Sequence, residues 1–383
     1  MKILFVASDN YHASGAFLCM VKLILCLKEW GIDSLVILPK NGSGTELLKN
    51  NLIKYRIVKS YNWGIQIDKK RNVLCKMIIA IKKLINYFAT YRISQIAHIE
   101  KCNLIHINTT YSYVGAMAAQ KISIPVVWHL REYMEEDQNM TFWNKEISYQ
   151  LINNSKSIIA ISANLAEKYN QIFDKEKLKV IYDGIDTKFC NPQKKILTQD
   201  NLKIAIIGRV SEKKGQNVVL QAVAKVLSMT TIEIIVRIVG GCSQEYMKEI
   251  QMQIANLGLK GVVELLGEKE NVIPYYEWAD ILVMASVSEA FGRVTVEGMM
   301  SGCLIIGSNT GGTQELVRHG ITGYQFEQGN SVDLADKILA AVQNKEMSRK
   351  IADTGRKDAM VRFTAENNAK EIVRIYEAIL NEK

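Results

Sequence analysis

Short apolar runs rich in Ile, Val and Leu recur along the chain, and between them lie longer stretches whose apolar residues return every three or four positions. The short runs are typical of strands in a parallel sheet that is buried on both faces. The longer stretches are typical of amphipathic helices that pack on such a sheet. In the first half of the chain, the predicted strands are residues 2–8, 34–39, 104–108, 126–129, 157–161 and 179–182, and the predicted helices include 16–30 and 113–120.

A second series of strands and helices begins near residue 202. Its predicted strands are residues 203–208, 232–239, 262–266, 281–285 and 304–307, and its predicted helices include 217–228, 244–257 and 294–300. Between the two series, residues 186–201 are polar and lack periodicity, so we expect a linker there. Because 383 residues suit two domains, the pattern predicts an α/β chain of two Rossmann-like domains, over residues 1–187 and 200–365.

Composition narrows the class of protein. Hydrophobic residues make up 48% of the chain and charged residues 23%, which is typical of a soluble globular protein and excludes a disordered or collagen-like chain. The seven cysteines are scattered without a C-x-x-C pair, so we expect neither a disulfide framework nor a zinc site, and we expect a cytoplasmic location. The apolar runs are too short or too polar to predict a transmembrane helix.

The net charge of +9 arises in the first hundred residues, which contain 15 Lys or Arg and six Asp or Glu. Residues 69–92 concentrate this excess and form a predicted basic amphipathic helix. One interpretation is a domain helix whose apolar face packs on the sheet; the other is a helix that lies on anionic lipid, peripheral to the inner face of a membrane. We expect no nucleic-acid partner, because no recognised binding motif is present. The apolar residues at helical spacing are Leu74, Met77, Ile78, Ile81, Leu84, Ile85 and Phe88.

The first predicted strand of the second series is followed by a turn that contains two basic residues. Arg209 and Lys214 lie five residues apart, just after the carboxyl end of the predicted strand 203–208. Side chains at such a position can converge on one phosphate group, and the positive end of the following helix would add to their field. An ordinary solvated turn with incidental charges explains the same residues equally well.

A stronger block follows the predicted strand 281–285. Glu289 comes directly after that strand, and Gly292 permits a tight turn where the next helix begins. The backbone N–H groups of Arg293 and Val294 would then face outward at the first helical turn and could meet an anion. Glu297 lies about one turn further on, where its carboxylate could accept hydrogen bonds from two vicinal hydroxyls of a ribose.

These motifs occur in the order Gly-Arg-x4-Lys-Gly, Glu-x7-Glu and Gly-Gly-x-x-Glu, the last over residues 311–315. In this order the chain resembles the retaining glycosyltransferases of family 4, which have the GT-B fold: two Rossmann-like domains that face a central cleft. Residues 183–189 are similar to the segment that closes the N-terminal domain in that family. Residues 126–132 are similar to its strand-end histidine motif. The resemblance also implies that the C-terminal helix, residues 366–383, crosses back to the N-terminal domain.

The resemblance implies a role for each matching residue. Arg209 and Lys214 would bind the diphosphate of a nucleotide sugar donor, and Gly15 would let the N-terminal domain approach it. The remaining predicted site residues comprise His129 and Glu289 as catalytic residues at the sugar, the backbone from Phe291 through Gly292 and Arg293 to Val294 at sugar and phosphate, and Glu297 at the ribose.

The reaction that the resemblance implies is transfer of a hexose or N-acetylhexosamine, with retention, from a UDP- or GDP-linked donor to a glycan or lipid-linked acceptor in polysaccharide or lipopolysaccharide assembly. Because Arg and Lys can stabilise the leaving diphosphate, we expect no metal and no other cofactor. Two alternatives stay open: a nucleotide-sugar epimerase of the same fold, and a non-catalytic protein that binds sugar nucleotides. His106 lies inside a predicted strand, and we expect it to be a buried core residue with satisfied hydrogen bonds.

Overall fold

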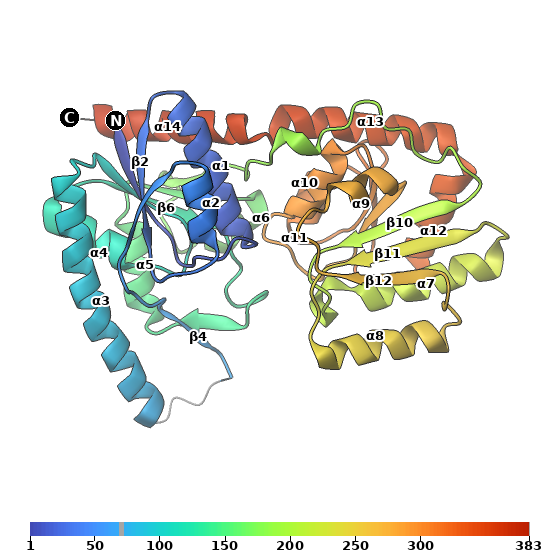
Figure 1. The fold of residues 1–383 in the computed structure, drawn as a ribbon, viewed down its shortest axis with the longest axis horizontal. Coiled ribbons are helices and arrows are strands. Elements are labelled where there is room, and N and C mark those ends of the chain that lie inside the picture. The colour runs from blue at the N-terminus through green and yellow to red at the C-terminus, as the bar shows by residue number, and fades with distance from the viewer. Residues whose placement is uncertain (69–72, 383) are drawn as a thin grey trace. The chain divides into compact units, whose positions relative to one another are not determined.

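The structure is a computed structural model that describes residues 1–68 and 73–382. The described chain divides into two compact units (Figure 1). Unit 1 comprises Met1–Gly184 together with the C-terminal segment that begins at Ala365, and unit 2 comprises Ile185–Thr364. Each unit is an α/β domain built around its own parallel sheet, which confirms the predicted fold class.

Unit 1 contains a seven-stranded parallel sheet in the order β3-β2-β1-β5-β6-β8-β9. A short antiparallel pair, β4 and β7, lies apart from it. The strands are β1 (Lys2–Val6), β2 (Asp33–Leu38), β3 (Lys54–Ile57), β4 (Gly64–Gln66), β5 (Leu104–Ile107), β6 (Val126–Leu130), β7 (Met140–Phe142), β8 (Ser157–Ala160) and β9 (Leu178–Val180). Residues 3–6 and 104–107 are buried throughout, as central strands with two covered faces must be.

Helices cover the sheet of unit 1. They are α1 (Gly15–Glu29), α2 (Gly44–Asn50), α3 (Val73–Ile99), α4 (Val114–Ile122), α5 (Lys145–Asn153), α6 (Ala163–Tyr169) and α14 (Ala365–Asn381). The hydroxyl of Ser14 caps α1 by accepting the N–H of Phe17, which places the helix start directly after the first loop. The last helix, α14, buries Ala369, Ile372 and Tyr376 in the same core as residues of β1 and α1, so the end of the chain is part of unit 1.

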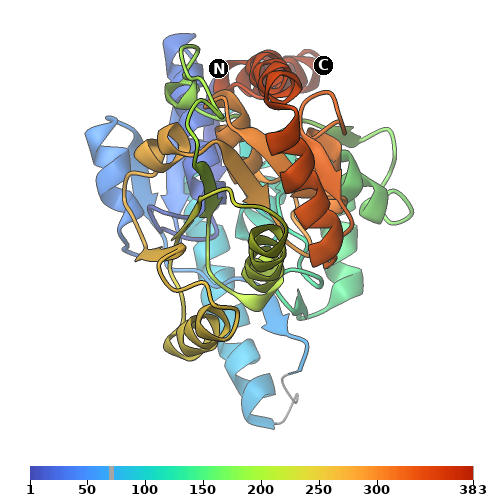
Figure 2. The ribbon, with the colours of Figure 1, turned by 90° about the vertical axis from the view of Figure 1, so that its right-hand side faces the viewer.

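Unit 2 contains a six-stranded parallel sheet in the order β12-β11-β10-β13-β14-β15. Figure 2 shows its helices around that sheet. The strands are β10 (Leu202–Ile207), β11 (Ile234–Val239), β12 (Val263–Gly267), β13 (Ile281–Met284), β14 (Leu304–Ser308) and β15 (Tyr324–Phe326). The helices are η1 (Thr187–Phe189), η2 (Glu212–Lys214), α7 (Gln216–Met229), α8 (Gln244–Asn256), α9 (Ile273–Trp278), α10 (Arg293–Met300), α11 (Gly311–Leu316), α12 (Ser331–Gln343) and α13 (Lys345–Arg362).

The structure differs from the sequence-based expectation at residues 186–201. These residues belong to unit 2 and do not form a free linker. Ile196 and Leu197 are buried in the core of unit 2, and the backbone N–H of Leu197 donates to the carboxylate of Asp280. Phe189 is buried as well, and Arg349 donates to the carbonyls of Ile196 and Leu197, so a few apolar side chains without periodicity and several hydrogen bonds hold the stretch against unit 2. The chain passes from unit 1 to unit 2 between Gly184 and Ile185.

Helix α3 also differs from one of its two interpretations. Most of the predicted apolar face is exposed to solvent instead of packing on the sheet; the exposed residues are Leu74, Met77, Ile78, Ile81, Leu84 and Phe88. Residues 69–72, the start of the predicted basic segment, lie outside the described residues, as does residue 383. Within residues 1–68 and 73–382, no helix is both long and apolar enough to cross a bilayer.

Candidate functional site

In each of the two large sheets, there is one point where the order in which strands are added reverses from one side of the sheet to the other. In unit 2 the strands that follow β10 extend to one side and those that begin with β13 extend to the other, so β10 and β13 are neighbours at the switch. In unit 1 the corresponding neighbours are β1 and β5. In open α/β sheets, ligands bind outside the carboxyl ends of the strands at such a point. The loops after these strands carry most of the predicted site residues.

The loop after β10 presents the two predicted phosphate-binding cations. Gln216 fixes the conformation of the loop, since its side-chain amide donates to the carbonyl of Arg209 and accepts the N–H of Ser211. The Arg209 side chain is exposed, and Lys214 is about one-third exposed. Gly215 has a φ of +69°, and a Cβ there would lie 2.1 Å from the carbonyl oxygen of residue 285, so only glycine lets the loop close onto β13.

Lys214 forms an ion pair with Glu289, from the loop after β13, at a distance of 2.5 Å. The hydroxyl of Ser286 donates to the same carboxylate oxygen at 2.8 Å. The loops after β10 and β13 are further joined by the N–H of Val287, which donates to the carbonyl of Lys213. The structure therefore brings together one of the predicted phosphate-binding residues and the predicted sugar-binding carboxylate.

Two glycines place the loop after β14 against the loop after β13. The N–H of Gly312 donates to the carbonyl of Glu289 at 2.7 Å. A Cβ on Gly312 would lie 2.2 Å from the carbonyl oxygen of Phe291, and one on Gly311 would lie 2.7 Å from that of Glu289. The Gly-Gly pair is therefore a structural requirement for the backbone conformation of residues 289–291. The Gly-Gly pair shapes the site through close backbone packing against residues 289–291.

Helix α10 begins at Arg293, with Gly292 at the N-cap in a left-handed conformation (φ +100°). The first N–H groups of a helix have no acceptor within it, and they carry the positive end of the helix dipole. Glu297 is 5% exposed and accepts two hydrogen bonds: one oxygen from the Arg293 guanidinium at 3.0 Å, and the other from the Tyr276 hydroxyl at 2.7 Å. Burial, followed by the neighbouring carboxylate, raises the pKa of Tyr276 well above its ordinary value.

The other predicted positions of this block lie beside Glu297. The Phe291 side chain is buried and meets Phe363 edge to face, whereas Val294 is half-buried. The hydroxyls of Thr295 and Thr313 are buried without a hydrogen-bond partner among the described residues. Unsatisfied buried hydroxyls are uncommon and mark places where a ligand or water could complete the hydrogen bonding.

In unit 1, His129 lies near the carboxyl end of β6 and is fully buried. Its Nδ1 lies 3.2 Å from Nε2 of His106, on the neighbouring strand β5, and 3.2 Å from Nη2 of Arg131. The other ring nitrogen of His106 lies 2.6 Å from the hydroxyl of Tyr376, on α14. His106 is thus a buried residue with both nitrogens satisfied, as expected from the sequence.

These contacts determine the tautomer of His129. A guanidinium can only donate, so Nδ1 of His129 must be the acceptor for Arg131. In a neutral ring the proton then lies on Nε2, and this N–H is buried without a partner in the part of the chain that the structure describes. His106 in turn carries its proton on Nε2 and accepts the Tyr376 hydroxyl at Nδ1.

Both rings are neutral at ordinary pH. Burial, together with the charge of Arg131, lowers the pKa of His106 to about 3 and holds the pKa of His129 well below its usual range. Arg131 is itself buried and forms an ion pair with Asp183, two residues before unit 2 begins. His129 is therefore built to donate a hydrogen bond from Nε2, for example to a hydroxyl oxygen.

The first loop of unit 1 contains Gly15, which is the first residue of α1. The carboxylate of Asp9 organises the loop by accepting the hydroxyl of Ser14 and the N–H of Tyr11. Burial raises the pKa of Asp9. The predicted position of Gly15, after β1 and at a helix start, is therefore the observed one, whereas its approach to a diphosphate stays a prediction.

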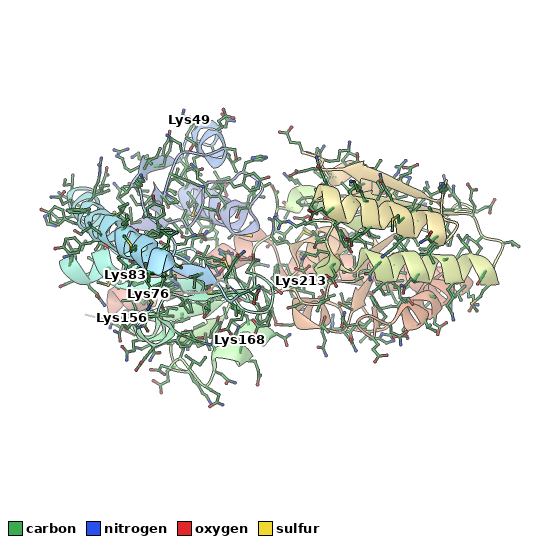
Figure 3. The ribbon with its side chains drawn as sticks, turned by 90° about the horizontal axis from the view of Figure 1, so that it is seen from below. Lys49, Lys76, Lys83, Lys156, Lys168 and Lys213 are labelled. Carbon is green, nitrogen blue, oxygen red and sulfur yellow. The ribbon has the colours of Figure 1, made fainter. Side chains whose placement is uncertain are left out.

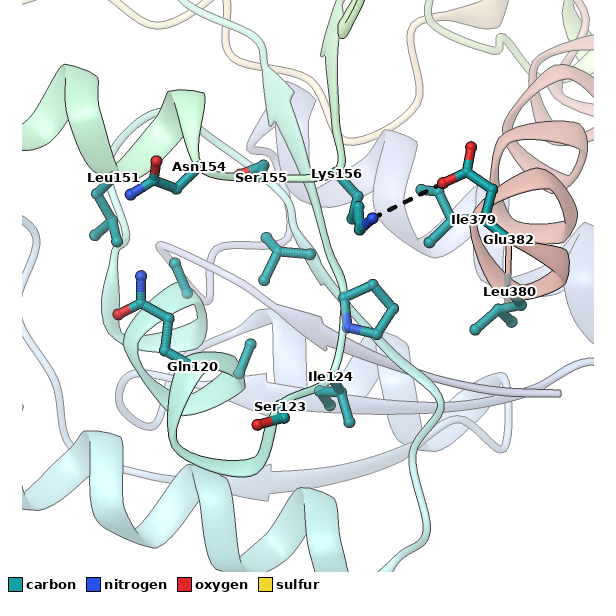
Figure 4. A pocket seen from close by; sticks show the side chains of 14 residues that line it. Gln120, Ser123, Ile124, Leu151, Asn154, Ser155, Lys156, Ile379, Leu380 and Glu382 are labelled. Atoms are coloured by element: carbon teal, nitrogen blue, oxygen red, sulfur yellow. Dashed lines mark ion pairs between the residues drawn. The ribbon is translucent and has the colours of Figure 1, made fainter.

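A pocket of about 390 Å³ lies elsewhere in unit 1, between α4, α5 and α14 (Figure 4). Pro125 and Val126, where β6 begins, form part of its wall. Lys156 and Glu382, which form an ion pair with an N–O distance of 3.8 Å, also line it. This is the amino end of the strands, opposite to His129. We therefore do not assign it to the candidate site.

Among residues 1–68 and 73–382, no group of three or more His, Cys, Asp or Glu side chains is arranged to hold a metal ion. Sequence reasoning missed the partners Tyr276, Ser286 and Tyr376, and it placed His106 in the core without foreseeing its contact with His129. Each is an ordinary polar residue of an apolar segment, and the sequence distance to its partner reaches 270 residues for Tyr376. No local pattern signals a pairing over such a distance; Ser286, three residues from Glu289, is the exception.

Two family models match adjacent parts of the chain. The model described as Glycosyltransferase Family 4 matches residues 14–189, and the model described as Glycosyl transferases group 1 matches residues 189–358. The boundary between them lies close to the passage from unit 1 to unit 2.

Several individual proteins that are similar to this chain are named as glycosyltransferases. N-acetyl-alpha-D-glucosaminyl L-malate synthase of Bacillus anthracis is 27% identical over 62% of this chain and 59% of its own length. An uncharacterized glycosyltransferase of Methanocaldococcus jannaschii is 27% identical over 58% of this chain. The matches span about 60% of the length of these curated relatives. The crystal structure of Anabaena HepE in complex with UDP-glucose has a TM-score of 0.78, with 25% identity over 99% of this chain and 100% of that one.

Proposed function

This chain belongs to glycosyltransferase family 4, and we propose that it transfers a hexose or N-acetylhexosamine from a nucleotide diphosphate sugar to a glycan or lipid-linked acceptor, with retention of anomeric configuration. The observation that carries the proposal is the grouping in unit 2 of Lys214 and Glu289, on the loops after β10 and β13, with Glu297 on α10, the helix that follows the second loop. One cation and two carboxylates at these positions match a diphosphate flanked by two polyhydroxylated rings.

The donor would be held by the loops after β10 and β13. Arg209 and Lys214 would bind the diphosphate, together with the N–H groups of the first turn of α10. Glu297, already oriented by Arg293 and Tyr276, would accept hydrogen bonds from the ribose hydroxyls. Glu289 would exchange its contact with Lys214 for hydroxyls of the donor sugar. The sugar nucleotide would thus replace the internal ion pair with contacts to the same side chains.

In the reaction we propose, the bond between the anomeric carbon and the leaving phosphate oxygen breaks while the acceptor oxygen attacks the same face. The acceptor proton passes to an oxygen of the leaving diphosphate. Arg209 and Lys214 would stabilise the negative charge that develops on that group. His129 would donate its Nε2 proton in a hydrogen bond to a hydroxyl of the transferred sugar and so orient the reacting carbon.

UDP is the nucleotide that we favour, because the Anabaena relative was solved with UDP and with UDP-glucose. For the transferred sugar, the Bacillus anthracis relative is named for N-acetylglucosaminyl transfer, so both glucose and N-acetylglucosamine are reasonable first donors. The acceptor we propose is a glycan or a lipid-linked sugar.

Thermal shift with UDP, GDP and ADP, and with their sugars, tests the donor site. A nucleotide at 100 times its dissociation constant stabilises a protein by about 2.7 kcal/mol. We expect such a shift for UDP and its loss in Glu297→Ala. The matched control is Glu270→Ala, which removes an exposed carboxylate from the same unit. Absence of a shift with every nucleotide would refute the proposal.

Product analysis tests the reaction. Incubation with UDP-glucose or UDP-N-acetylglucosamine should release UDP and form a glycoside or, without acceptor, the free sugar. Conversion of the donor into a stereoisomer that remains attached to UDP would instead identify an epimerase. Binding without either conversion, across a panel of glycan and lipid-linked acceptors, would identify a non-catalytic protein.

A further inference from the structure

Helix α3 carries its bulky apolar residues on the side that faces solvent. Along the helix they recur every three or four positions, so they form one continuous stripe. The exposed fraction of each of these residues lies between 44% and 64%. We name the following residues the α3 stripe: Leu74, Met77, Ile78, Ile81, Leu84, Phe88 and Tyr91.

The opposite side of α3 faces unit 1 and is largely small or polar; its buried residues are Asn86, Ala89, Thr90, Ile93, Ser94 and Ala97. Asn86 shows that this orientation is specific. Its amide accepts the N–H of Tyr61 and donates to the carbonyl of the same residue, both at 2.8 Å. Rotation of the helix to bury the stripe would break this pair of hydrogen bonds. An amphipathic helix that packs on its own domain would show the reverse arrangement.

The charges near the α3 stripe have a single sign. Helix α3 contains four Lys or Arg and no Asp or Glu, and α4, which packs beside it, contains Lys121 and no acidic residue. Lys76 and Lys83 are exposed, and Figure 3 shows both on α3. Lys82 and Lys121 lie over the rings of Tyr61 and Tyr87, at 5.5 and 5.6 Å.

We propose that α3 binds the surface of an anionic lipid bilayer, with the α3 stripe inserted among the lipids and Lys76 and Lys83 at the phosphate level. A helix with an apolar face flanked by cations lies in the plane of such an interface. The first turns of α3 extend beyond the neighbouring elements of unit 1, where a flat surface can reach them (Figures 1 and 2). The apolar area alone would also suit another protein; the uniform positive charge is what selects anionic lipid.

This inference goes beyond the proposed reaction and does not rest on it. Each cation close to an anionic surface strengthens binding by about five- to sixfold, so replacing two of them by neutral residues weakens binding by about 30-fold. Added salt weakens the same attraction, because ions screen charges over about 10 Å at 0.1 M. The apolar contribution of the α3 stripe, by contrast, does not depend on salt.

Co-sedimentation of the full chain with vesicles tests the proposal. We expect binding to vesicles of phosphatidylcholine with 30% phosphatidylglycerol, and at least tenfold weaker binding to pure phosphatidylcholine. Lys76→Gln with Lys83→Gln should weaken binding by about 30-fold at low salt. Ile81→Glu with Leu84→Glu should abolish it, and because both residues are exposed, the melting temperature should not change.

The matched control is Lys49→Gln with Lys260→Gln, which removes the same charge from exposed positions outside α3. It should bind as the parent does. Equal loss in the control and in the α3 variant would mean that only net charge matters, which would overturn the assignment to α3. Failure of the parent to bind anionic vesicles would also overturn it. So would a concentration-dependent dimer that Ile81→Glu with Leu84→Glu disrupts while vesicle binding persists, since a second copy would then cover the stripe.

Discussion

The hydroxyl of Tyr376, on the last helix, lies 2.6 Å from Nδ1 of His106, on a central strand, although 270 residues separate them in the chain. The contact links the C-terminal helix to His129 through one histidine ring. Tyr376 and His106 are therefore positioning residues for the Nε2 proton that we propose His129 offers to the sugar.

Replacing Tyr376 with Phe tests this chain of hydrogen bonds from Tyr376 through His106 to His129. The variant leaves Nδ1 of His106 buried without a donor, which costs about 1–3 kcal/mol of unfolding free energy. We expect the tautomer of His106 to become mixed, as read by ¹⁵N NMR of the imidazole nitrogens. We also expect kcat to fall while the affinity for UDP, which we propose unit 2 binds, is unchanged. Tyr91→Phe, at an exposed tyrosine, is the control, and an unaltered ¹⁵N spectrum in Tyr376→Phe would argue against this chain of hydrogen bonds.

Acid should unfold the protein through its two buried histidines. In the folded state the pKa of His106 is about 3 and that of His129 is also lowered, against 6.5 for an ordinary histidine. Below pH 6.5 the unfolded chain therefore binds protons that the folded chain does not. The stability that these groups contribute is present above pH 6.5 and is lost as the pH falls toward 3.

Denaturant titrations between pH 7 and 4 measure this effect. For each histidine the free energy of unfolding should fall by about 1.4 kcal/mol per pH unit. Burial raises the pKa of Asp9 and Glu132, so these carboxyls act in the opposite direction. The comparison is therefore between the parent and His106→Gln, whose slope should be smaller by one proton, with His98→Gln as the exposed control. An identical slope in His106→Gln and the parent would contradict the expectation.

Replacing Glu289 with Gln should separate nucleotide binding from sugar recognition. The carboxylate neutralises Lys214 at 2.5 Å in the absence of donor. Without that charge, Lys214 is free to bind a diphosphate, so we expect UDP to bind as tightly as to the parent or several-fold more tightly. UDP-glucose should lose any advantage over UDP. Isothermal titration with both ligands measures this, and weaker UDP binding would show that Glu289 supports the phosphate site.

Replacing Gly312 with Ala should damage the site without touching a ligand. The new Cβ would lie 2.2 Å from the carbonyl of Phe291, so the loop after β13 must shift. Forcing extra atoms into packed structure costs about 1–3 kcal/mol, and we expect nucleotide affinity to fall as well. At Gly241 the nearest atom to an added Cβ is the carboxylate end of Glu268 at 3.3 Å, so Gly241→Ala is a mild control.

Removal of divalent metal should leave transfer active. In the donor site that we propose, Arg209, Lys214 and the first turn of α10 would supply the positive charge that the diphosphate needs. Rates measured in EDTA and in Mg²⁺ should agree within a few-fold. Loss of activity in EDTA, restored by one metal, would show that these residues are insufficient.

Much of the fold and of the donor half follows from the sequence. The apolar runs predict the central strands of both sheets to within about two residues, because a strand buried on both faces needs an unbroken apolar run. The edge strands β9 and β12 were also predicted, whereas the short strands β3, β4, β7 and β15 were not, since edge and isolated strands need no unbroken apolar run. Arg209, Glu289 and Glu297 could be grouped in advance, because the carboxyl ends of parallel strands meet at one edge of a sheet.

The sequence by itself determined which residues share a strand, a helix face or a loop, and this includes the apolar stripe of α3 and the positive charge beside it. Only the tertiary structure decided which side of α3 faces unit 1, and that Tyr376 reaches His106 and Tyr276 reaches Glu297. The physical reason is that periodicity reports which residues are neighbours within one element. Packing and hydrogen bonds between distant elements depend instead on which strands and helices become neighbours in the folded domain.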